Sequence, residues 1–182
     1  MRPYMKTVKI KDKEFELFLT QETIEKAIDD VAARLSNDLK DKDPLFICVL
    51  NGSFMYASEL MKRVSVPSEV SFVKMSSYKG TTSTGKIKEI YGLEEDIKGR
   101  TIVIVEDIVD TGYTMTLMLE QLICDEPKEI LITTLLLKPD ALQHELKLDY
   151  VALEIPSDFI VGYGLDYDGY GRNLPDIYKI KN

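Results

Sequence analysis

The chain has 182 residues, of which 45% are hydrophobic and 30% are charged, and its formal net charge is −8. This size predicts a single domain over residues 1–182 with a sizeable core. The acidic balance, without a long basic run, argues against nucleic acid as a partner. No apolar stretch reaches transmembrane length, and residues 1–13 lack the apolar core of a signal peptide, so we expect a cytoplasmic protein without a membrane partner.

The N-terminal elements follow from the apolar pattern. Residues 6–18 alternate weakly and predict one or two short strands. Thr20 can cap a helix that runs to about Leu39, with apolar positions close to a 3.6-residue period. Residues 45–50 are all apolar, which predicts a strand covered on both faces. Helical spacing returns at residues 54–64.

The central elements repeat this order. A strand is expected at residues 70–75, followed by a long polar loop at 76–85, and such loops are often functional. A second apolar run at 101–105 leads through an acidic stretch into a helix at 115–123. Three further strands are predicted at 130–137, 151–155 and 159–161. Strands that alternate with helices predict an α/β fold, with a mainly parallel sheet flanked by helices.

The chain has two cysteines and one histidine. Cys48 and Cys124 each stand in an apolar context, so we expect two buried free thiols in a reducing compartment. His144 stands in a stretch that resembles the surface of a helix, and a Ser-His-Asp triad would have to use it. We expect no direct catalytic role for His144, and no Cys/His zinc site.

The acidic stretch after the strand at 101–105 is the strongest candidate site. Ligands of open α/β sheets bind beyond the carboxyl ends of the strands. Here Glu106, Asp107 and Asp110 precede Thr111 and Gly112, which open a helix. The helix start suits a phosphate, and carboxylates suit ribose hydroxyls or Mg²⁺, so the pattern predicts a phosphorylated sugar. A capped helix with favourable acidic residues is the structural alternative, but three clustered carboxylates repel one another and need a reason.

Residues 105–114, Val-Glu-Asp-Ile-Val-Asp-Thr-Gly-Tyr-Thr, resemble the diphosphate-sugar binding motif of the type I phosphoribosyltransferases, most closely the hypoxanthine-guanine branch. Other segments fit the same family in its own order. Residues 50–53 are similar to its pyrophosphate loop, 77–85 to its mobile lid and 136–138 to its purine-reading strand end. Residues 154–167 are similar to its purine and metal segment, with Arg172 following, so the resemblance spans roughly residues 45–180.

The resemblance implies a phosphoribosyltransferase fold with a small hood lobe built from the N-terminal strands and the C-terminal segment. It implies purine salvage with Mg²⁺ as cofactor. The 5-phosphoribosyl group of 5-phosphoribosyl-1-diphosphate would pass to hypoxanthine or guanine, forming IMP or GMP and pyrophosphate. It also implies a homodimer or homotetramer whose other partners are small-molecule substrates.

The resemblance also implies roles for single residues. Asp110 would be the general base near purine N7, Lys138 would donate to the 6-oxo group, and Arg172 would meet the pyrophosphate. These three are the catalytic candidates. The residues implied to bind the diphosphate sugar are Leu50, Asn51, Gly52, Ser77, Tyr78, Glu106, Asp107, Asp110, Thr111, Gly112, Tyr113 and Thr114. The purine candidates are Lys138, Phe159, Ile160 and Asp166, and the metal candidates are Glu106, Asp107 and Asp166.

Two residues depart from the family pattern. Asn51 stands where relatives often carry lysine, so a neutral donor replaces a positive charge near the pyrophosphate. Tyr113 occupies a variable place. Taken singly, Lys138 also fits a strand-end charge, Phe159 a core residue and Asp166 a turn residue.

Two other functions remain open at this stage. A regulator with the same fold would sense the diphosphate sugar without turnover, and it would be expected to show a basic face. A transferase for a pyrimidine would not need the pair Lys138 and Phe159. Nucleotide formation with different bases separates the three possibilities.

Overall fold

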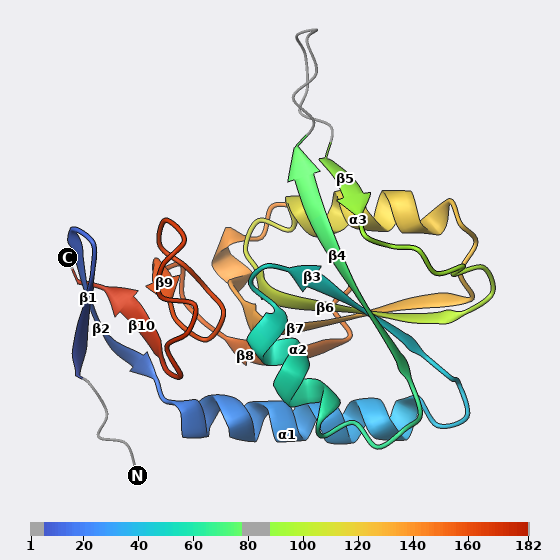
Figure 1. Ribbon diagram of the computed structural model, residues 1–182, viewed down its shortest axis with the longest axis horizontal. Helices are drawn as coiled ribbons and strands as arrows, with labels where there is room; N and C mark the ends of the chain where they lie inside the picture. The colour runs from blue at the N-terminus through green and yellow to red at the C-terminus, as the bar shows by residue number, and fades with distance from the viewer. Residues whose placement is uncertain (1–5, 78–87, 182) are drawn as a thin grey trace, which may run out of the picture.

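The structure is a computed structural model that describes residues 6–77 and 88–181, shown in Figure 1. Within these ranges the larger sheet has six strands in the order β5-β4-β3-β6-β7-β8. Their bounds are β3 Leu45–Leu50, β4 Glu69–Ser77, β5 Lys88–Tyr91, β6 Thr101–Val109, β7 Glu129–Leu137 and β8 Tyr150–Glu154. All neighbours pair in parallel except β5, which runs antiparallel to β4. The predicted α/β class with a mainly parallel sheet is confirmed.

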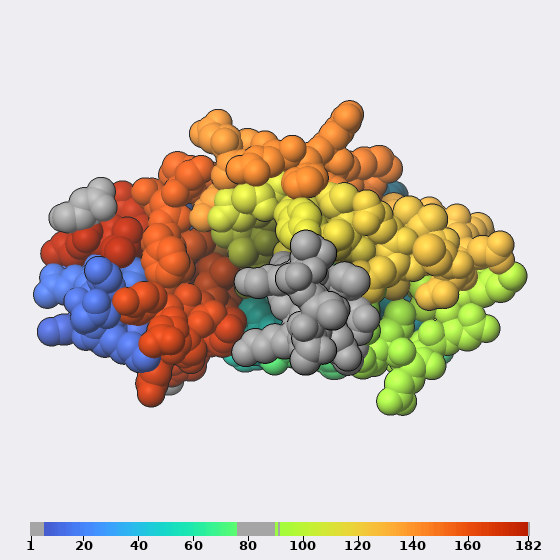
Figure 2. Space-filling model, turned by 90° about the horizontal axis from the view of Figure 1, so that it is seen from above, coloured from blue at the N-terminus to red at the C-terminus, as the bar shows by residue number. Residues whose placement is uncertain are grey.

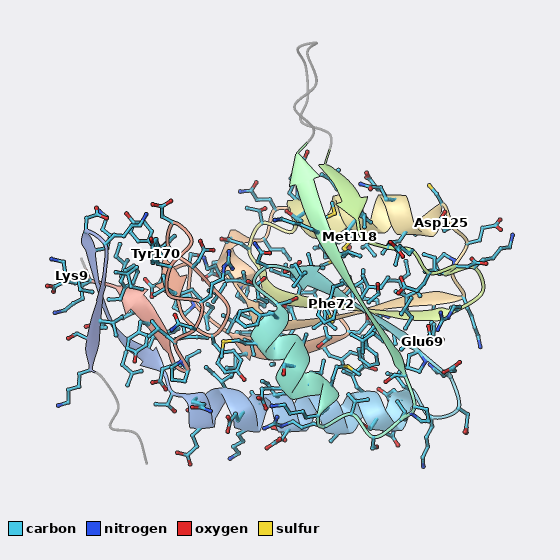
Figure 3. All side chains as sticks on the ribbon, in the orientation of Figure 1. Lys9, Glu69, Phe72, Met118, Asp125 and Tyr170 are labelled. Carbon is cyan, nitrogen blue, oxygen red and sulfur yellow. The ribbon has the colours of Figure 1, made fainter. Side chains whose placement is uncertain are left out.

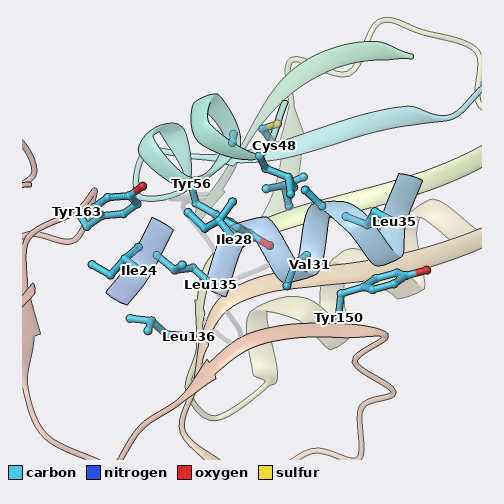
Figure 4. Close-up of a cluster of buried hydrophobic side chains, with 14 of the residues drawn as sticks. Ile24, Ile28, Val31, Leu35, Cys48, Tyr56, Leu135, Leu136, Tyr150 and Tyr163 are labelled. Atoms are coloured by element: carbon cyan, nitrogen blue, oxygen red, sulfur yellow. The ribbon is translucent and has the colours of Figure 1, made fainter. Parts of the chain in front are cut away.

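Helices cover both faces of this sheet. Helices α1 (Gln21–Asp38) and α2 (Phe54–Met61) lie on one face, and α3 (Tyr113–Ile123) lies on the other (Figure 1). In Figure 4, the buried side chains of α1 face Cys48, Tyr56 and Leu135. Strand β3 contributes Phe46 and Cys48 to this cluster, and its alternate residues pack toward α3. The continuous apolar run is therefore explained by burial on both faces.

A second sheet is built from segments far apart in the sequence. It has the order β1-β2-β10-β9, with every pair antiparallel, and we call it the hood. Its strands are β1 Thr7–Ile10, β2 Lys13–Leu19, β9 Ile160–Val161 and β10 Ile177–Ile180. The buried side chains of Phe15, Val161 and Tyr178 pack inside it. Asp176 ties the hood to the start of α1, because its Oδ1 accepts a hydrogen bond from the Gln21 backbone N–H at 2.8 Å.

Several boundaries agree with the sequence and others do not. Helix α1 begins as predicted, since the Thr20 hydroxyl accepts a hydrogen bond from the Thr23 N–H at 3.3 Å. Strand β6 is longer than predicted because its pairing with β7 continues to Val109, so Glu106 and Asp107 lie in the strand and not beyond it. Strands β5 and β10 were not predicted. The polar loop at 76–85 falls almost wholly outside the described residues, and Ser76 belongs to β4.

Two expectations about single residues are wrong. His144 does not lie on a helix: after a short 3-10 turn, η1 (Pro139–Ala141), the chain up to β8 is irregular. Cys124 is exposed at the end of α3, and only Cys48 is a buried free thiol. Apolar neighbours did not distinguish the end of an amphipathic helix from a core strand. None of the described helices is long and apolar enough to cross a membrane.

Candidate active site

Strand β6 positions the two adjacent carboxylates of the site. Glu106 is only 9% exposed, and its Oε1 accepts a hydrogen bond from the Asp107 N–H at 3.1 Å. Both residues lie in the part of β6 that leads toward α3, and the pairing of β6 with β7 continues past them at Ile108 and Val109. The sheet therefore holds these carboxylates more rigidly than a loop would.

Three distant segments meet at Gly52, in the loop between β3 and α2. A Cβ atom placed on Gly52 would lie 1.6 Å from Asp107 Oδ2, so the carboxylate occupies the space that a side chain would need. From the C-terminal segment, Gly164 approaches the same residue, and its Cβ would lie 2.0 Å from the Gly52 carbonyl oxygen. Gly164 also has a φ of +99°, which favours glycine. The predicted pyrophosphate loop thus contacts both the predicted ribose carboxylate and the predicted metal segment.

This contact yields a prediction for Gly52→Ala. The new methyl group would displace the Asp107 carboxylate or the loop, so we expect at least a ~10²-fold loss of kcat/KM, because small misplacements at a site have effects of this size. The control is Gly99→Ala, where an added Cβ meets nothing within 4 Å but the φ of +69° still strains the backbone. Steady-state kinetics of both variants make the measurement. Equal kcat/KM values in the two variants would contradict the role of this contact.

Residues 110–112, which lie between the end of β6 and the start of α3, form the predicted phosphate loop. Gly112 has a φ of +83° and precedes the helix. A small cavity of about 100 Å³ adjoins the loop. It is lined by Glu106, Ile108, Val109, Asp110, Thr111, Gly112, Thr114 and Met115. Because a helix start directs N–H groups at such a space, the cavity suits a phosphate group.

The segment after η1 forms hydrogen bonds to the phosphate loop. The sequence did not predict this contact. The Thr111 carbonyl oxygen accepts hydrogen bonds from the backbone N–H groups of Gln143, at 3.0 Å, and His144, at 3.3 Å. The rings of His144 and Tyr113 lie 5.6 Å apart at a tilt of 43°. His144 therefore packs against the loop through its backbone and ring.

Lys138 and Asp110 form an ion pair at the carboxyl ends of β7 and β6. The Lys138 Nζ lies 3.0 Å from Asp110 Oδ2. Lys138 is only 8% exposed, whereas half of the Asp110 side chain is exposed. The lysine backbone is fixed as well, because its N–H donates to the Val109 carbonyl oxygen at 3.0 Å. The sequence named both residues, but it did not predict that they contact each other.

Phe159 directly precedes β9 of the hood, and its carbonyl oxygen accepts a hydrogen bond from the Ile180 N–H at 2.9 Å. Its side chain is 46% exposed. Its ring lies 6.3 Å from Phe15 and 5.9 Å, edge to face, from Tyr167. Ile160 is buried in β9, an edge strand of the hood that pairs only with β10 among the described residues. The Phe159 ring therefore has two aromatic contacts and is still about half exposed, so it can stack on a base.

Arg172 and Asp166 form the last part of the site. The Arg172 Nη2 lies 2.5 Å from Asp166 Oδ1, and the Arg172 Nη1 donates to the Gly164 carbonyl oxygen at 2.7 Å. Asp166 Oδ2 accepts from the Gly169 N–H at 2.6 Å, so Asp166 is also a turn residue. Figure 2, seen from the side on which α3 lies, shows the C-terminal segment in orange and red beside the yellow start of that helix.

The remaining candidates are Leu50, Asn51, Ser77 and Tyr78. Leu50 ends β3 and is half-buried, Asn51 is exposed in the loop that follows it, and Ser77 ends β4. Tyr78 lies outside the described residues. Sequence reasoning placed Gly164 and Tyr167 in the segment at 154–167 but gave neither a role of its own. The Gly-Tyr-Gly spacing at 162–164 was a signal for the first, since two glycines so close indicate close backbone contacts.

Comparisons with known proteins agree with this arrangement. A model of the phosphoribosyl transferase domain matches residues 16–168. The hypoxanthine-guanine phosphoribosyltransferase of Bacillus subtilis is 38% identical over 167 residues, which cover 91% of this chain and 93% of the relative. That of Streptococcus pyogenes is 41% identical over 149 residues, covering 81% and 83%. A crystal structure of a hypoxanthine phosphoribosyltransferase from Staphylococcus aureus superposes with a TM-score of 0.84 at 35% identity, covering 91% of each chain. The chain therefore belongs to the phosphoribosyltransferase family.

Proposed function

We propose that this protein is a purine salvage enzyme that transfers the 5-phosphoribosyl group of 5-phosphoribosyl-1-diphosphate to hypoxanthine or guanine. One observation carries the proposal. The buried Lys138 amine contacts the Asp110 carboxylate at the carboxyl ends of β7 and β6, and Asp110 also lines the cavity beside the phosphate loop. A 6-oxopurine and a phosphorylated sugar are the ligands that such a set of groups can hold together. The relatives that bear this activity in their names support it.

The reaction replaces the bond between the sugar C1′ and pyrophosphate by a bond from C1′ to purine N9. Displacement at an anomeric carbon passes through a cationic, oxocarbenium-like state. Asp110 would accept the proton that the purine loses, near N7. Lys138 would leave Asp110 and donate to the 6-oxo group, while Phe159 stacks on the base. Arg172 would bind the departing pyrophosphate together with the backbone of the loop at Asn51 and Gly52.

Different residues would bind the 5-phosphate and the ribose. Asp110, Thr111, Gly112 and Thr114 line the small cavity, and the N–H groups and hydroxyls of residues 110–114 would bind the 5-phosphate. Glu106 and Asp107 would accept hydrogen bonds from the ribose hydroxyls. Ser77 and Tyr78 remain candidates for covering the diphosphate sugar. Together these groups would fix the sugar between its phosphate and its leaving group, which is how positioning accelerates a displacement.

The residues present fit a Mg²⁺ ion that binds together with the substrate. Mg²⁺ retains several waters and usually takes one or two protein carboxylates plus substrate phosphates. Within the described residues no three acidic, histidine or cysteine side chains form a preformed metal site. Asp107 contacts Gly52. Gly164, two residues before Asp166, also contacts Gly52. We propose Asp107 and Asp166, with Glu106 on the ribose side, as the metal ligands. When bound, the ion would stabilise charge on the leaving pyrophosphate.

An uncovered apolar face supports self-association. On β4, Val70 and Phe72 are 39% and 50% exposed, while Ser71 and Val73 between and after them are buried. Val70 and Phe72 pair with Phe46 and Cys48 of β3, so they lie on the α2 face of the sheet. Figure 3 labels Phe72 there. We propose that a second copy covers this face in a homodimer or homotetramer.

One assay tests the proposed function. The protein is incubated with 5-phosphoribosyl-1-diphosphate, Mg²⁺ and hypoxanthine, guanine, adenine or a pyrimidine in turn, and nucleotide formation is followed. We expect IMP and GMP, loss of turnover with a chelator and its return with Mg²⁺. Binding of the diphosphate sugar without any nucleotide would indicate a regulator. A pyrimidine nucleotide would indicate another transferase, and undiminished turnover after thorough chelation would exclude the metal.

A further inference from the structure

The turn between β1 and β2, formed by Lys11 and Asp12, contacts the loop that carries Asp166. The Tyr167 hydroxyl donates a hydrogen bond to Asp12 Oδ1 at 2.9 Å, across 155 positions of sequence. Next to it, Lys11 forms an ion pair with Asp168 and lies over the ring of Tyr170, with its Nζ 4.8 Å from the ring centroid. Tyr170 is labelled on the hood in Figure 3. Two residues of the N-terminal hairpin thus contact three consecutive or nearly consecutive residues of the C-terminal segment.

Tyr167 also contacts Phe159, the proposed purine-stacking residue. Its ring centroid lies 6.0 Å from that of Phe15 in the hood core and 5.9 Å from that of Phe159. The planes of Tyr167 and Phe159 are inclined by 86°, an edge-to-face contact, and such a contact favours one orientation of the ring. Phe159 is the proposed stacking ring and is only half covered. The orientation of its open face therefore depends on the placement of Tyr167.

The backbone of Tyr167 is held as well. Its N–H donates to the Tyr170 carbonyl oxygen at 2.9 Å, and the Tyr170 N–H donates back to the Tyr167 carbonyl oxygen at 3.1 Å. The preceding residue, Asp166, is fixed by the Gly169 N–H and by Arg172. Because the backbone turn is closed by itself, the Asp12 bond adds mainly control of the Tyr167 side chain. Its loss should affect the aromatic contact more than the leaving-group residues.

The charge states of the two partners agree with this bond. The hydrogen bond from Tyr167 lowers the pKa of the Asp12 carboxyl, and the same bond to Asp12 raises the pKa of the Tyr167 phenol. The neutral phenol therefore donates to an ionised carboxylate at neutral pH, and a charged acceptor makes a hydrogen bond stronger.

We propose that Tyr167, held by Asp12, is a positioning residue that orients Phe159 for the purine base. This inference rests on the proposed function. The β1–β2 turn is thereby part of the purine site, although neither Lys11 nor Asp12 touches the base. Loss of the Tyr167 hydroxyl weakens purine binding and leaves the diphosphate sugar and the chemical step largely unaffected.

The test is Tyr167→Phe, which keeps the ring and removes only the hydroxyl. We expect the KM for hypoxanthine to rise about 3- to 10-fold, the range that corresponds to one hydrogen bond. The kcat and the KM for 5-phosphoribosyl-1-diphosphate should stay within about twofold, because loss of uniform binding raises KM alone. Asp12→Ala should behave in the same way, whereas Asp12→Asn, which keeps a neutral acceptor oxygen, should raise the KM for hypoxanthine less than Asp12→Ala does.

The matched control is Tyr150→Phe. Tyr150 of β8 donates to Asp38 Oδ2 at the end of α1, also at 2.9 Å, so this variant removes the same kind of bond far from the site. It should lower the melting temperature without changing the KM for hypoxanthine. An unchanged KM in Tyr167→Phe, or an equal rise of both KM values, overturns the proposal. Calorimetric binding of IMP repeats the comparison without turnover, so failure of the inference is distinct from failure of the proposed function, which wild-type assays decide.

Discussion

Asp110→Asn is expected to lower kcat by about 10²–10⁴-fold, the usual effect of removing a general base. The asparagine side chain has nearly the same size and still offers an oxygen to Lys138, so the local packing is kept. It cannot accept the purine proton. The KM for 5-phosphoribosyl-1-diphosphate should change much less, because the phosphate contacts that we propose for residues 111–114 would come from the backbone and hydroxyls.

Pre-steady-state and steady-state rates of IMP formation make the measurement. The control is Asp140→Asn, since Asp140 is an exposed aspartate in η1, two residues after Lys138. It should leave kcat within about twofold, as substitutions at exposed positions usually do. Full activity in Asp110→Asn would remove this carboxylate from the mechanism.

Adenine is expected to be essentially inert, with kcat/KM about 10⁴-fold below that of hypoxanthine. A lysine ammonium has three donors and no acceptor. Lys138 is buried, and it can leave its partner Asp110 only if another acceptor replaces it. The 6-oxo group of hypoxanthine or guanine supplies that acceptor. The 6-amino group of adenine presents a donor, which would leave a buried charge unsatisfied.

The ratio of specificity constants for hypoxanthine and adenine is the measurement. Lys138→Gln provides the comparison, because an amide can either donate or accept, so the ratio should fall toward unity while both constants decrease. Comparable constants for the two bases in the wild type would show that Lys138 does not read position 6.

The fold could be predicted where local pattern and burial coincide. The run at 45–50 indicated a strand covered on both faces, and β3 has that burial because helices lie on each side of it. The stretch before β8 was wrongly read as a helix, because Leu142 and Leu146 are four residues apart, as on a helix face, whereas in the structure both pack against Gly112 without forming a helix. The short strand β5 depends on its pairing with β4, and β10 depends on its pairing with β2 at the other end of the sequence; no local pattern specifies either strand.

The candidate site, like the fold, could be predicted only in part from the sequence. Residues that act within one loop could be named from the motif, as Asp110 and Thr111 were. Contacts between loops could not, because Gly52 and Asp107 are brought together only by the order of β3 and β6 in the sheet. The same holds for Tyr167 and Asp12, whose bond requires the hood to close from both ends of the sequence. Tertiary arrangement, and not local chemistry, decides such pairs.

The glycines on either side of Tyr163 restrict how this enzyme can be recombined with its relatives. A Cβ on Gly162 would lie 2.1 Å from the Asp176 carbonyl oxygen in the hood, just as one on Gly164 would collide with the Gly52 carbonyl oxygen in the core. At Gly164 the C-terminal segment therefore meets the loop at Gly52 backbone to backbone, with no side chain at that point to absorb a misfit. A chimaera that exchanges the hood must transfer residues 162–164 and 176 together with the loop at 52, since a graft cut between them would separate surfaces that fit only as a set.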